Sequence, residues 1–562
     1  MYTGKVNGMF GIKMKQISSL NKILSESDFN NCNKVEQAAV LQGEHYAYQI
    51  ACLSTVKYKM KAEVETSIKD CVNLFSVDDA VVDSPLYYYR ADDDYVTSEK
   101  GLMPDILVPI KDKAGTICMD GVKTLWVDVN IPKDLEPGVY TITTKFKNLS
   151  KCEQVNLSLS VTMKLTVLDA KIVPQETIFT QWFHTDCIAS VHNVEIYSKE
   201  HWELIDRYMK MASDNGMNMI FTPILSLNLD VDFGKKRPNV QLVDITLDKN
   251  GYKFDFSKLK KWIALCKKNN FKYYELSHLF SQHGLKYASN VVADMNGEKS
   301  SLFGWNTKGD SERYAEFLKL FIPKILEVLE EEGIKDATYF HISDEPQFAN
   351  FESYKYAHDL IRTLIGDCKI LEAVSNYEFY ETGMIDTPAV CGMFPYLGGF
   401  LENKVDNMFI YHSNICSINV PNRFLAMPHH RSRVLGYIMY KYGIKGLLHW
   451  GYNFYYNAGS EYTINPYLTT SGDGYYPSGD AFSVYPGEDG PICSARMKVF
   501  KDALQDVQIC KMLEKHIGKE NVIKLIEDEA GMEINFEEYP RNNKFYDNLN
   551  QKMKELIAKY SK

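Results

Sequence analysis

The strongest constraint on the fold is a repeat of short apolar runs and amphipathic segments between residues 178 and 450. Eight runs have the length and the aromatic and β-branched content of buried strands. They are residues 178–184, 217–222, 272–277, 338–343, 370–375, 389–393, 408–412 and 444–450. Helical segments separate most of them, at 200–215, 256–269, 311–332, 351–365 and 428–442, although the fifth and sixth connections are less plainly helical. This pattern predicts a (β/α)8 TIM barrel; a doubly wound sheet is the alternative, but no Gly-rich phosphate loop supports it.

The residues before this repeat form a different pattern. Residues 124–132 and 139–146 flank a Pro-Gly turn, and residues 155–168 alternate clearly between apolar and polar side chains. Strands joined by short turns, with few helices, predict an N-terminal β-sandwich. The expected organisation is a β-sandwich domain at 1–172, a catalytic barrel at 173–516, closed by a helix at 494–514, and a C-terminal helical appendage at 517–562.

Composition excludes several classes of function. The chain has 562 residues and a net charge of −10, which argues against nucleic acid as a partner. No apolar run reaches membrane-spanning length, and the first residues contain no apolar signal region, so the chain as given is expected to be cytoplasmic or released by another route. The 12 cysteines form no C-x-x-C motif, so neither a zinc site nor a disulfide framework is expected. The acidic stretch 90–95 lacks calcium-loop spacing and is interpreted as a solvated loop.

The candidate catalytic residues follow the fourth run. Its aromatic and β-branched residues give way within two positions to Asp344 and Glu345, and Pro346 then ends the strand. Asp344 as a helix cap, with Glu345 in the first turn, is the simpler interpretation. Two neighbouring carboxylates repel each other, however, and are costly to hold together unless the chemistry uses both. The charges at a strand's C-terminal end therefore predict an active site.

Polar residues also end most of the other runs. They are His184 and Asp186, Ser277 and His278, Asn376 and Tyr377, His412 and Asn414, and His449 and Trp450. A lone histidine is more often a core residue, but a barrel brings its strand ends together on one rim. The Gly- and Tyr-rich stretch 451–490, which contains Tyr475, is interpreted as a lid or wall of the pocket.

Adjacent carboxylates favour an unusual form of glycoside hydrolysis. In a two-carboxylate glycosidase the two carboxyl groups lie about 5 Å or more apart, on opposite faces of the scissile bond. Sequence neighbours on a strand have Cα atoms only about 3.8 Å apart and side chains that point in different directions, so they are poorly placed to flank that bond. A 2-acetamido group on the substrate can instead attack C1 and form an oxazolinium ion. Asp344 would then orient the acetamide N–H and stay ionised, while Glu345 would be general acid and then general base. His341 could support the pair from behind, although a buried core histidine is equally expected.

Several motifs together resemble glycoside hydrolase family 123. They are His341-Ile-Ser-Asp-Glu-Pro346, Thr180-Gln-Trp-Phe-His-Thr-Asp186, Asn422-Arg-Phe with Gly446-Leu-Leu-His-Trp-Gly-Tyr-Asn453, and Ser494-Ala-Arg-Met-Lys with Leu504-Gln-Asp506. The resemblance covers residues 175–515 and places the family's catalytic pair on Asp344 and Glu345. It implies an exo-acting, retaining β-N-acetylgalactosaminidase that releases terminal β-linked GalNAc, including from glycosphingolipid glycans, without metal or organic cofactor.

The remaining pocket is inferred from strand ends and aromatic residues. Tyr396 or Tyr411 is expected to hold the acetamide oxygen, and Trp305 and Trp450 to pack against the sugar ring. The full set of expected substrate-binding residues is His184, Trp305, Asn376, Tyr377, Tyr396, Tyr411, Asn414, Trp450 and Tyr475. Two alternatives stay open: a two-carboxylate glycosidase with Glu275 as nucleophile, and a carbohydrate-binding protein without activity. Preference for GalNAc over GlcNAc depends on one hydroxyl and cannot be read from the pattern.

Overall fold

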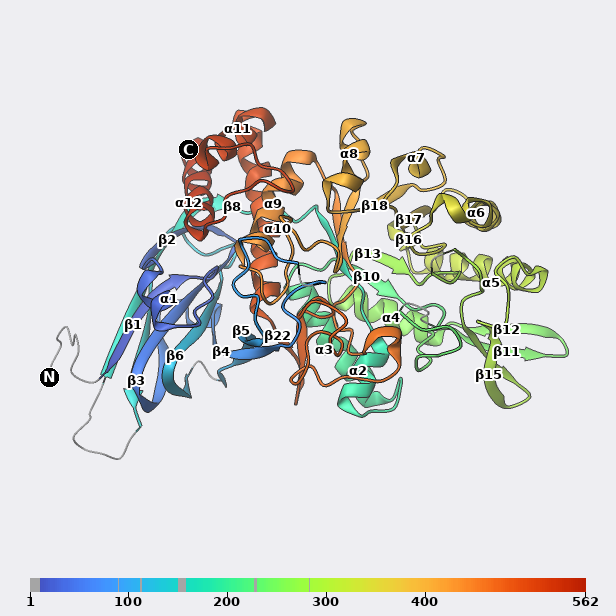
Figure 1. Cartoon of the computed structure of the whole chain (residues 1–562), viewed down its shortest axis with the longest axis horizontal. Helices are drawn as coiled ribbons and strands as arrows, with labels where there is room; N and C mark the ends of the chain where they lie inside the picture. The colour runs from blue at the N-terminus through green and yellow to red at the C-terminus, as the bar shows by residue number, and fades with distance from the viewer. Residues whose placement is uncertain are drawn as a thin grey trace.

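The computed structural model describes residues 11–88, 90–111, 114–149, 158–226, 230–282 and 284–561. It consists of a β-rich N-terminal region, a central parallel barrel and a group of C-terminal helices (Figure 1). The predicted domain boundaries at residues 172 and 516 stay predictions, and residues 1–10 of the first predicted domain lie outside the described residues. Among the helices of the described residues, each is too short or too polar to span a lipid bilayer.

One eight-stranded sheet forms the N-terminal region. Its strands are β1 (Ile12–Ser18), β2 (Gln37–Gln42), β3 (His45–Glu65), β4 (Val72–Val82), β5 (Gly101–Pro109), β6 (Ala114–Asn130), β7 (Gly138–Asn148) and β8 (Ser158–Lys171). Their order is β2-β8-β7-β3-β6-β4-β5, with β1 on β3. The predicted β-rich region is confirmed. Hydrogen bonds join all these strands into one sheet, so its division into two packed sheets stays a prediction.

Two strands of this sheet explain its shape. The strand β3 is 21 residues long, and its register with β6 shifts between Ser54 and Tyr58. Beyond the shift the same strand also pairs with β7, so the sheet can bend around its own apolar residues. The predicted strand 155–168 corresponds to β8, apart from residues 155–157, which lie outside the described residues.

The second eight-stranded sheet is a nearly closed parallel barrel. Its strands are β9 (Ile178–Gln181), β10 (Met219–Thr222), β13 (Tyr273–Leu276), β16 (Thr338–Phe340), β17 (Lys369–Ala373), β18 (Thr387–Cys391), β19 (Phe409–His412) and β20 (Gly446–His449). Each pairs with the next in chain order, and β20 returns to pair with β9. At the remaining seam, the Asn218 side chain accepts from the Phe179 amide at 2.8 Å, and the Asn218 amide donates to the Phe179 carbonyl at 3.1 Å.

Helices cover the barrel. They are α2 (Thr185–His192), α3 (Lys199–Asp214), α4 (Ser257–Lys268), α5 (Glu312–Glu331), α6 (Phe351–Ile365), α7 (Tyr377–Tyr380), α8 (Phe394–Glu402), α9 (His430–Tyr442) and α10 (Ala495–Ile517). The hairpins β11 (Asp244–Asp248) with β12 (Gly251–Asp255) and β14 (Val291–Met295) with β15 (Glu298–Phe303) extend from the barrel at the right of Figure 1. Ser311 caps the start of α5, and Gly333, at φ 66°, follows its end as predicted.

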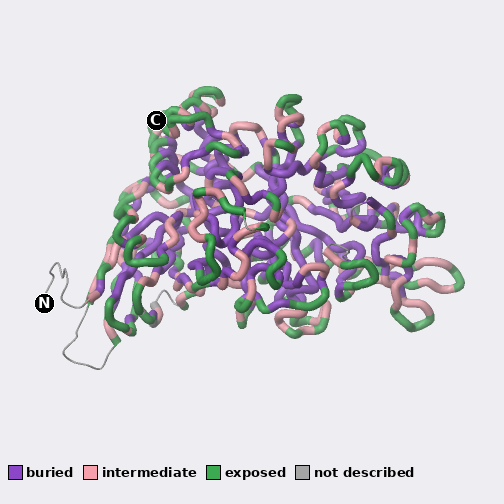
Figure 2. Tube along the Cα trace, in the orientation of Figure 1, coloured by how far each residue is buried: buried purple, intermediate pink, exposed green. Residues whose placement is uncertain are grey.

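The C-terminal helices α11 (Lys519–Ala530) and α12 (Asn543–Tyr560) both contact α10, and α12 lies next to strands β2 and β8 (Figure 1). Apolar side chains of α12 are buried in the same core as the barrel helices, and Figure 2 shows many buried, purple segments through the centre of the molecule. Hydrogen bonds also join the N-terminal sheet to α10: the His45 ring lies between Asp128 and Asp502, each at 3.0 Å.

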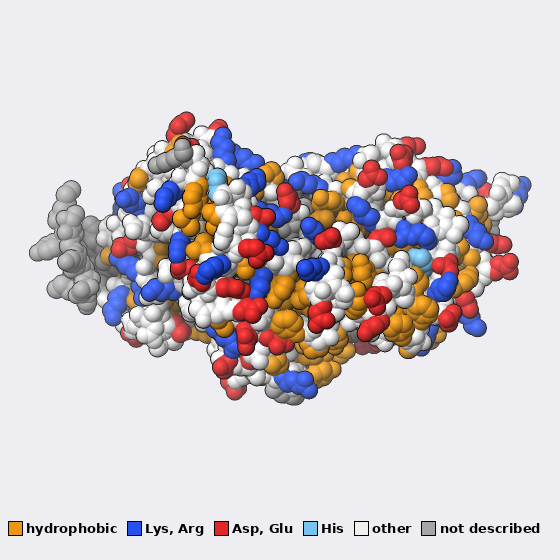
Figure 3. Space-filling model, turned by 90° about the horizontal axis from the view of Figure 1, so that it is seen from above, with side chains coloured by type: hydrophobic (Ala, Val, Ile, Leu, Met, Phe, Trp, Pro, Cys, Tyr) orange, Lys and Arg blue, Asp and Glu red, His pale blue; other side chains and the backbone are white. Residues whose placement is uncertain are grey.

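The acidic stretch 90–95 contributes to this junction as well. Asp92 pairs with Arg431 of α9, and Asp94 lies 2.9 Å from His430. Asp93 pairs with Arg541 in the segment before α12. The interpretation as a solvated loop is therefore only partly correct, because Asp92 and Asp94 are partly buried against Arg431 and His430, which follow more than 330 residues later. Elsewhere charges are mixed: on the face seen in Figure 3, basic and acidic side chains alternate without a large field of one sign.

Candidate active site

The two predicted catalytic carboxylates lie just beyond the fourth barrel strand. Strand β16 ends at Phe340, so Asp344 and Glu345 lie in the following loop rather than on the strand itself. Glu345 has φ 50°, in the left-handed region that residues with a side chain adopt rarely and that is concentrated at functional sites. Asp344 is 8 % exposed and Glu345 is half-buried. The backbone turn at Glu345 lets the two carboxylates point to different surroundings.

Each carboxylate is held by a different part of the rim. Gln282, from the loop after β13, donates to Asp344 Oδ2 at 2.8 Å. The Tyr411 hydroxyl, from strand β19, donates to Glu345 Oε1 at 2.7 Å and lies 3.3 Å from Ser375 Oγ. Carboxylates that share a site but not an environment can divide acid and base roles between them. Of these two residues that contact the catalytic pair, Tyr411 was predicted from the sequence as a site residue and Gln282 was not.

The environment of Asp344 favours its protonated form. Burial first, and the charge of Glu345 second, raise the pKa of Asp344 to about 8, with a further contribution from Asp230. The hydrogen bond from Gln282 and the charge of His341 act in the opposite direction. The pair therefore retains one proton in neutral solution, which is the protonation state that general acid catalysis needs.

A buried ion network lies beneath the catalytic loop. His341 Nε2 is 2.7 Å from Glu275 Oε1, and His341 Nδ1 is 3.4 Å from Glu372 Oε2. Burial by itself lowers the pKa of His341, but hydrogen bonds and charge from Glu275 and Glu372 outweigh it and raise the pKa to about 10. His341 is consequently a cation below the catalytic pair. The hydrogen bonds of His341 give a geometric basis to the supporting role that the sequence suggested. The His341 ring and its two partners are also buried, as expected of a core histidine.

Glu372 also binds the backbone that leads to Asp344. Its Oε1 accepts the amide N–H groups of Ile342 at 2.6 Å and Ser343 at 3.2 Å. The Tyr354 hydroxyl donates to the same oxygen at 3.2 Å. Sequence reasoning missed Glu372, although a lone carboxylate inside an otherwise apolar strand was a usable signal, since a buried charge requires partners.

Glu275, the alternative nucleophile, is fully engaged elsewhere. It accepts hydrogen bonds from the Trp182 indole at 2.7 Å and the Thr180 hydroxyl at 2.8 Å, in addition to its contact with His341. Its side chain is completely buried. A nucleophile must be able to reach the anomeric carbon, so this arrangement favours a structural role for Glu275 over the two-carboxylate alternative.

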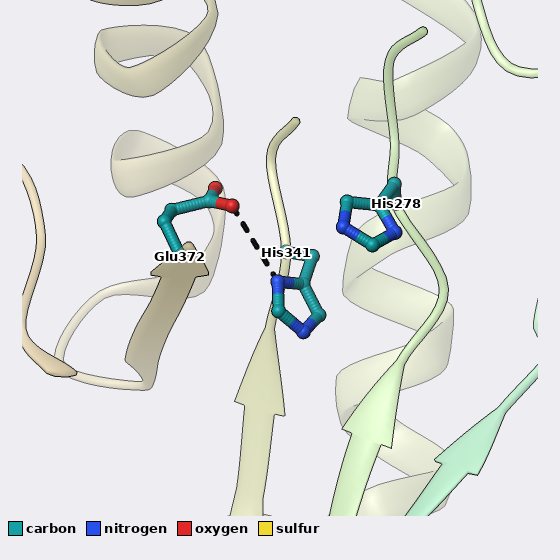
Figure 4. Close-up of side chains that lie close together, drawn as sticks. All are labelled: His278, His341 and Glu372. Carbon is teal, nitrogen blue, oxygen red and sulfur yellow. Dashed lines mark hydrogen bonds and ion pairs between the residues drawn. The ribbon is translucent and has the colours of Figure 1, made fainter. Parts of the chain in front are cut away.

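His278, His341 and Glu372 are the one group of potential metal ligands found among the described residues (Figure 4). The two imidazole rings are stacked, with centroids 4.3 Å apart and planes inclined by 22°. A metal ion lies in the plane of each imidazole that binds it, and nearly parallel stacked rings cannot direct nitrogens at a common ion. His341 Nδ1 is also directed at Glu372 (Figure 4). The arrangement fits a protonated, hydrogen-bonded His341 stacked on a neutral His278 ring better than it fits a metal site.

The other predicted substrate-binding residues differ in how accessible they are. Trp450 and Tyr396 are half-buried, as are Tyr377, Asn414 and Trp305, while Asn376 and Tyr475 are exposed. His184 is fully buried, with Nε2 3.0 Å from the Trp450 carbonyl and Nδ1 3.1 Å from Arg237. Asn376 caps α7 by accepting from the Phe379 amide at 2.7 Å. Their roles in substrate binding stay predictions; in this arrangement His184 can act only through its neighbours.

The long segment 451–490 contains many buried aromatic rings. Tyr452, Tyr455, Tyr456 and Tyr485 are buried in it, and Phe454 and Tyr476 pack around Trp450. The Trp450 indole donates to Asp480 Oδ2 at 3.2 Å. Burial raises the pKa of Asp480 to about 7, against the opposing charge of Arg423. The burial of these rings shows that the segment is closely packed, and its predicted role as a lid or wall of the substrate pocket stays a prediction.

A carboxylate pair at the carboxyl edge of a parallel barrel defines a barrel enzyme, and the sequence comparison identifies the class as glycoside hydrolases. The chain belongs to glycoside hydrolase family 123, because the model of that family's catalytic domain matches residues 182–513, more than half of the chain. No curated protein sequence matches significantly.

One solved structure gives the same result for the fold. A family 123 glycoside hydrolase from Clostridium perfringens, studied for glycolipid glycan hydrolysis, aligns with a TM-score of 0.71 over 98 % of this chain and 97 % of its own, at 15 % identity. A family 5 mannosidase from Rhizomucor miehei aligns over 62 % of this chain and 95 % of its own, with a TM-score of 0.34 at 10 % identity. The first similarity extends through the N-terminal sheet and the C-terminal helices, so the whole arrangement is shared.

Proposed function

We propose that this enzyme is an exo-acting, retaining β-N-acetylgalactosaminidase that releases terminal β-linked GalNAc from glycans such as those of glycosphingolipids. The solved relative's connection with glycolipid glycans supports the choice of substrate. The observation that carries the proposal is the adjacent pair itself, with Gln282 on Asp344 and Tyr411 on Glu345. Neighbouring carboxylates suit a substrate that supplies its own nucleophile, the 2-acetamido oxygen.

Each residue then has one task. Asp344 accepts the acetamide N–H and, as an anion, stabilises the positive charge that develops on the oxazolinium ring. Glu345 donates its proton to the departing glycosidic oxygen and later removes a proton from the attacking water. In the free enzyme burial favours a proton on Asp344. The bound acetamide N–H donor favours its anion, so substrate binding transfers the proton within the pair to Glu345. His341, as a cation beneath the loop, supports the same shift.

Matched variants test these roles. Glu345→Gln is expected to lose most activity, by about 10²-fold or more, on a natural glycan with a poor leaving group, and less on an aryl glycoside. Asp344→Asn is expected to reduce hydrolysis of both substrates, because oxazolinium formation is impaired whatever the leaving group. Initial rates with both substrates would reveal the difference. Equal losses in the two variants on both substrates would contradict the assignment.

Specificity and mechanism can be measured together. We expect the wild-type enzyme to hydrolyse an aryl 2-acetamido-2-deoxy-β-galactoside faster than its gluco epimer, and a thiazoline that mimics the oxazolinium ion to inhibit it. Activity that thiazoline does not affect would indicate a two-carboxylate glycosidase. Binding of either sugar without turnover would indicate the non-catalytic alternative.

A further inference from the structure

A groove that the catalytic mechanism does not use lies between the N-terminal sheet and the wall segment 451–490. Its volume is about 800 Å³, within the range of sites that bind small molecules. The lining comes from the segment after β4, the residues before β5 and one turn of the wall: Asp83, Ser84, Pro85, Leu86, Tyr87, Tyr88, Ser98, Glu99, Lys100, Gly474 and Tyr475. Two parts of the chain almost 400 residues apart therefore form one concave surface.

Hydrogen bonds hold the two sides of the groove together. The Asp83 carboxylate accepts from four hydroxyl groups of the wall, those of Thr469 at 2.5 Å, Ser471 at 2.6 Å, Ser478 at 3.0 Å and Thr470 at 3.4 Å. The Ser478 amide donates to the Ser84 carbonyl at 2.7 Å. A surface fixed in this way is preorganised, so a ligand that binds there spends little free energy on ordering it.

Aromatic rings connect the groove with the rim of the barrel. Tyr88 is 72 % exposed, and its ring lies against Tyr87 at a centroid distance of 4.2 Å. On the opposite side Tyr475 is 62 % exposed and contacts Tyr476 at 5.0 Å. Tyr476 in turn contacts Trp450 at 4.8 Å. Tyr88 also has φ 49°, a backbone conformation that is concentrated at functional sites.

The inner end of this row of rings is near the catalytic pair. Strand β20, which leads to Trp450, is paired with β19, and Leu448 lies opposite Tyr411 in the register. Paired strands are about 4.8 Å apart, and Trp450 is two residues, or about 7 Å, beyond Leu448 towards the rim. Tyr411 donates its hydroxyl hydrogen to Glu345, the proposed acid for the leaving group.

We propose that this groove binds sugar residues on the leaving-group side of the scissile bond, an inference that rests on the proposed glycosidase function. Exposed tyrosine rings present flat faces to the C–H face of a pyranose, while the hydroxyls of Ser84 and Ser98 and the carboxylate of Glu99 can hydrogen-bond its hydroxyl groups. An acyl chain in the same place would leave these polar groups without water or partners. The N-terminal sheet thereby acquires a role in substrate selection.

The test compares two substrates with the same terminal sugar. One is an aryl β-N-acetylgalactosaminide, whose aglycone ends before the groove; the other is an oligosaccharide in which the same sugar is β-linked to at least two further sugars. Tyr88→Ala is expected to lower kcat/KM for the oligosaccharide about three- to tenfold, the effect of one stacked ring, and to leave the aryl glycoside unaffected. Tyr88→Phe, which keeps the ring, should behave as wild type. Tyr560→Ala, at an exposed tyrosine of α12, is the matched control.

The outcomes separate this proposal from the proposed function. Equal effects of Tyr88→Ala on both substrates, or none on either, would overturn the sugar-binding groove while leaving the glycosidase assignment intact. A glycolipid that carries the same oligosaccharide serves as a third substrate, and a loss confined to it would assign the groove to the lipid and overturn the sugar-binding proposal. If wild type hydrolyses neither substrate, the proposed function fails; calorimetric binding of the oligosaccharide, compared between wild type and Tyr88→Ala, then still decides whether the groove binds sugar.

Discussion

At the scale of single residues, Asp344 determines how activity depends on pH. Burial and the charge of Glu345 raise its pKa to about 8, so the pair keeps one proton below that pH. The reaction needs one proton on the pair, so kcat/KM is expected to fall about tenfold per pH unit above pH 8. A profile of kcat/KM for an aryl glycoside between pH 5 and 10 would measure this. Constant activity up to pH 10 would contradict it.

The same pKa predicts an effect on stability. The folded-state pKa of about 8 lies above the unfolded value of about 3.9, so between these values the folded chain binds a proton that the unfolded chain does not. The free energy of unfolding therefore decreases as pH rises through this window. Asp344→Asn removes the buried carboxyl group whose ionisation opposes folding. The substitution is expected to stabilise the protein at pH 8 by about 2 kcal/mol or more, while abolishing most activity. Urea unfolding at pH 8 and pH 4 should show a gain that disappears at the lower pH.

Tyr411 and Tyr396 were equal candidates from sequence for holding the acetamide oxygen, which stays a prediction, and the structure places Tyr411 on the proposed acid Glu345. The Tyr411 hydroxyl bonds Glu345 at 2.7 Å, whereas Tyr396 packs among apolar side chains near Met393. Tyr411→Phe is expected to lower kcat about 10- to 100-fold on an aryl glycoside, because the carboxylate loses the donor that orients it. Tyr396→Phe is the matched control and should retain activity within about twofold. A larger loss for Tyr396→Phe would reverse the assignment.

At the scale of elements, β17 positions the catalytic loop that follows β16. Glu372→Ala removes the acceptor for the Ile342 and Ser343 amides and one partner of a buried cation, so we expect a loss of about 3 kcal/mol or more in stability together with low activity. Glu372→Gln keeps an oxygen for the amides but loses the charge beside His341. Glu275→Gln loses charge on the other side of His341 without touching the amides.

Comparing these three variants separates two effects of Glu372: its hydrogen bonds to the backbone of the catalytic loop and its charge beside His341. If the amide bonds matter most, kcat for Glu372→Gln should stay well above that for Glu372→Ala. If the charge matters most, Glu372→Gln and Glu275→Gln should shift the pH profile alike. Unchanged kcat and pH profile in all three folded variants would show that Glu372 does not position the loop.

The elements also show what the sequence could predict. Each of the eight predicted strands overlaps one observed barrel strand, because buried parallel strands are largely apolar runs, but most of the predicted ends differ by a few residues. The fourth was predicted to extend to Ser343 but ends at Phe340, since Glu372 binds the next amides in place of a neighbouring strand. A side chain about 30 residues away takes these hydrogen bonds, and no local pattern contains that information.

At the scale of the whole molecule, contacts between segments that are distant in sequence were again the part that the sequence could not predict. The motifs around Asp344 were sufficient to identify the family, because they are local in sequence. The groove, by contrast, forms only where residues 83–88 meet residues 474–475, and nothing in either segment indicates the other. Likewise, the acidic stretch 90–95 was interpreted as a solvated loop, since its partners Arg431 and Arg541 lie far along the chain.

The C-terminal helices provide a final prediction about how the molecule holds together. Tyr546, Leu549 and Met553 of α12 are fully buried, and Lys554 pairs with Glu44 of the N-terminal sheet at 2.8 Å. Removing residues 517–562 exposes this apolar face, so the shortened chain is expected to aggregate or to unfold at low temperature. Lys554→Met leaves Glu44 buried without its cation and should cost about 3 kcal/mol or more. The double variant Glu44→Gln/Lys554→Met should regain most of that loss, with activity unchanged throughout, because neither residue is near the catalytic pair. A fully stable and active 1–516 fragment would show instead that the barrel and the N-terminal sheet are sufficient by themselves.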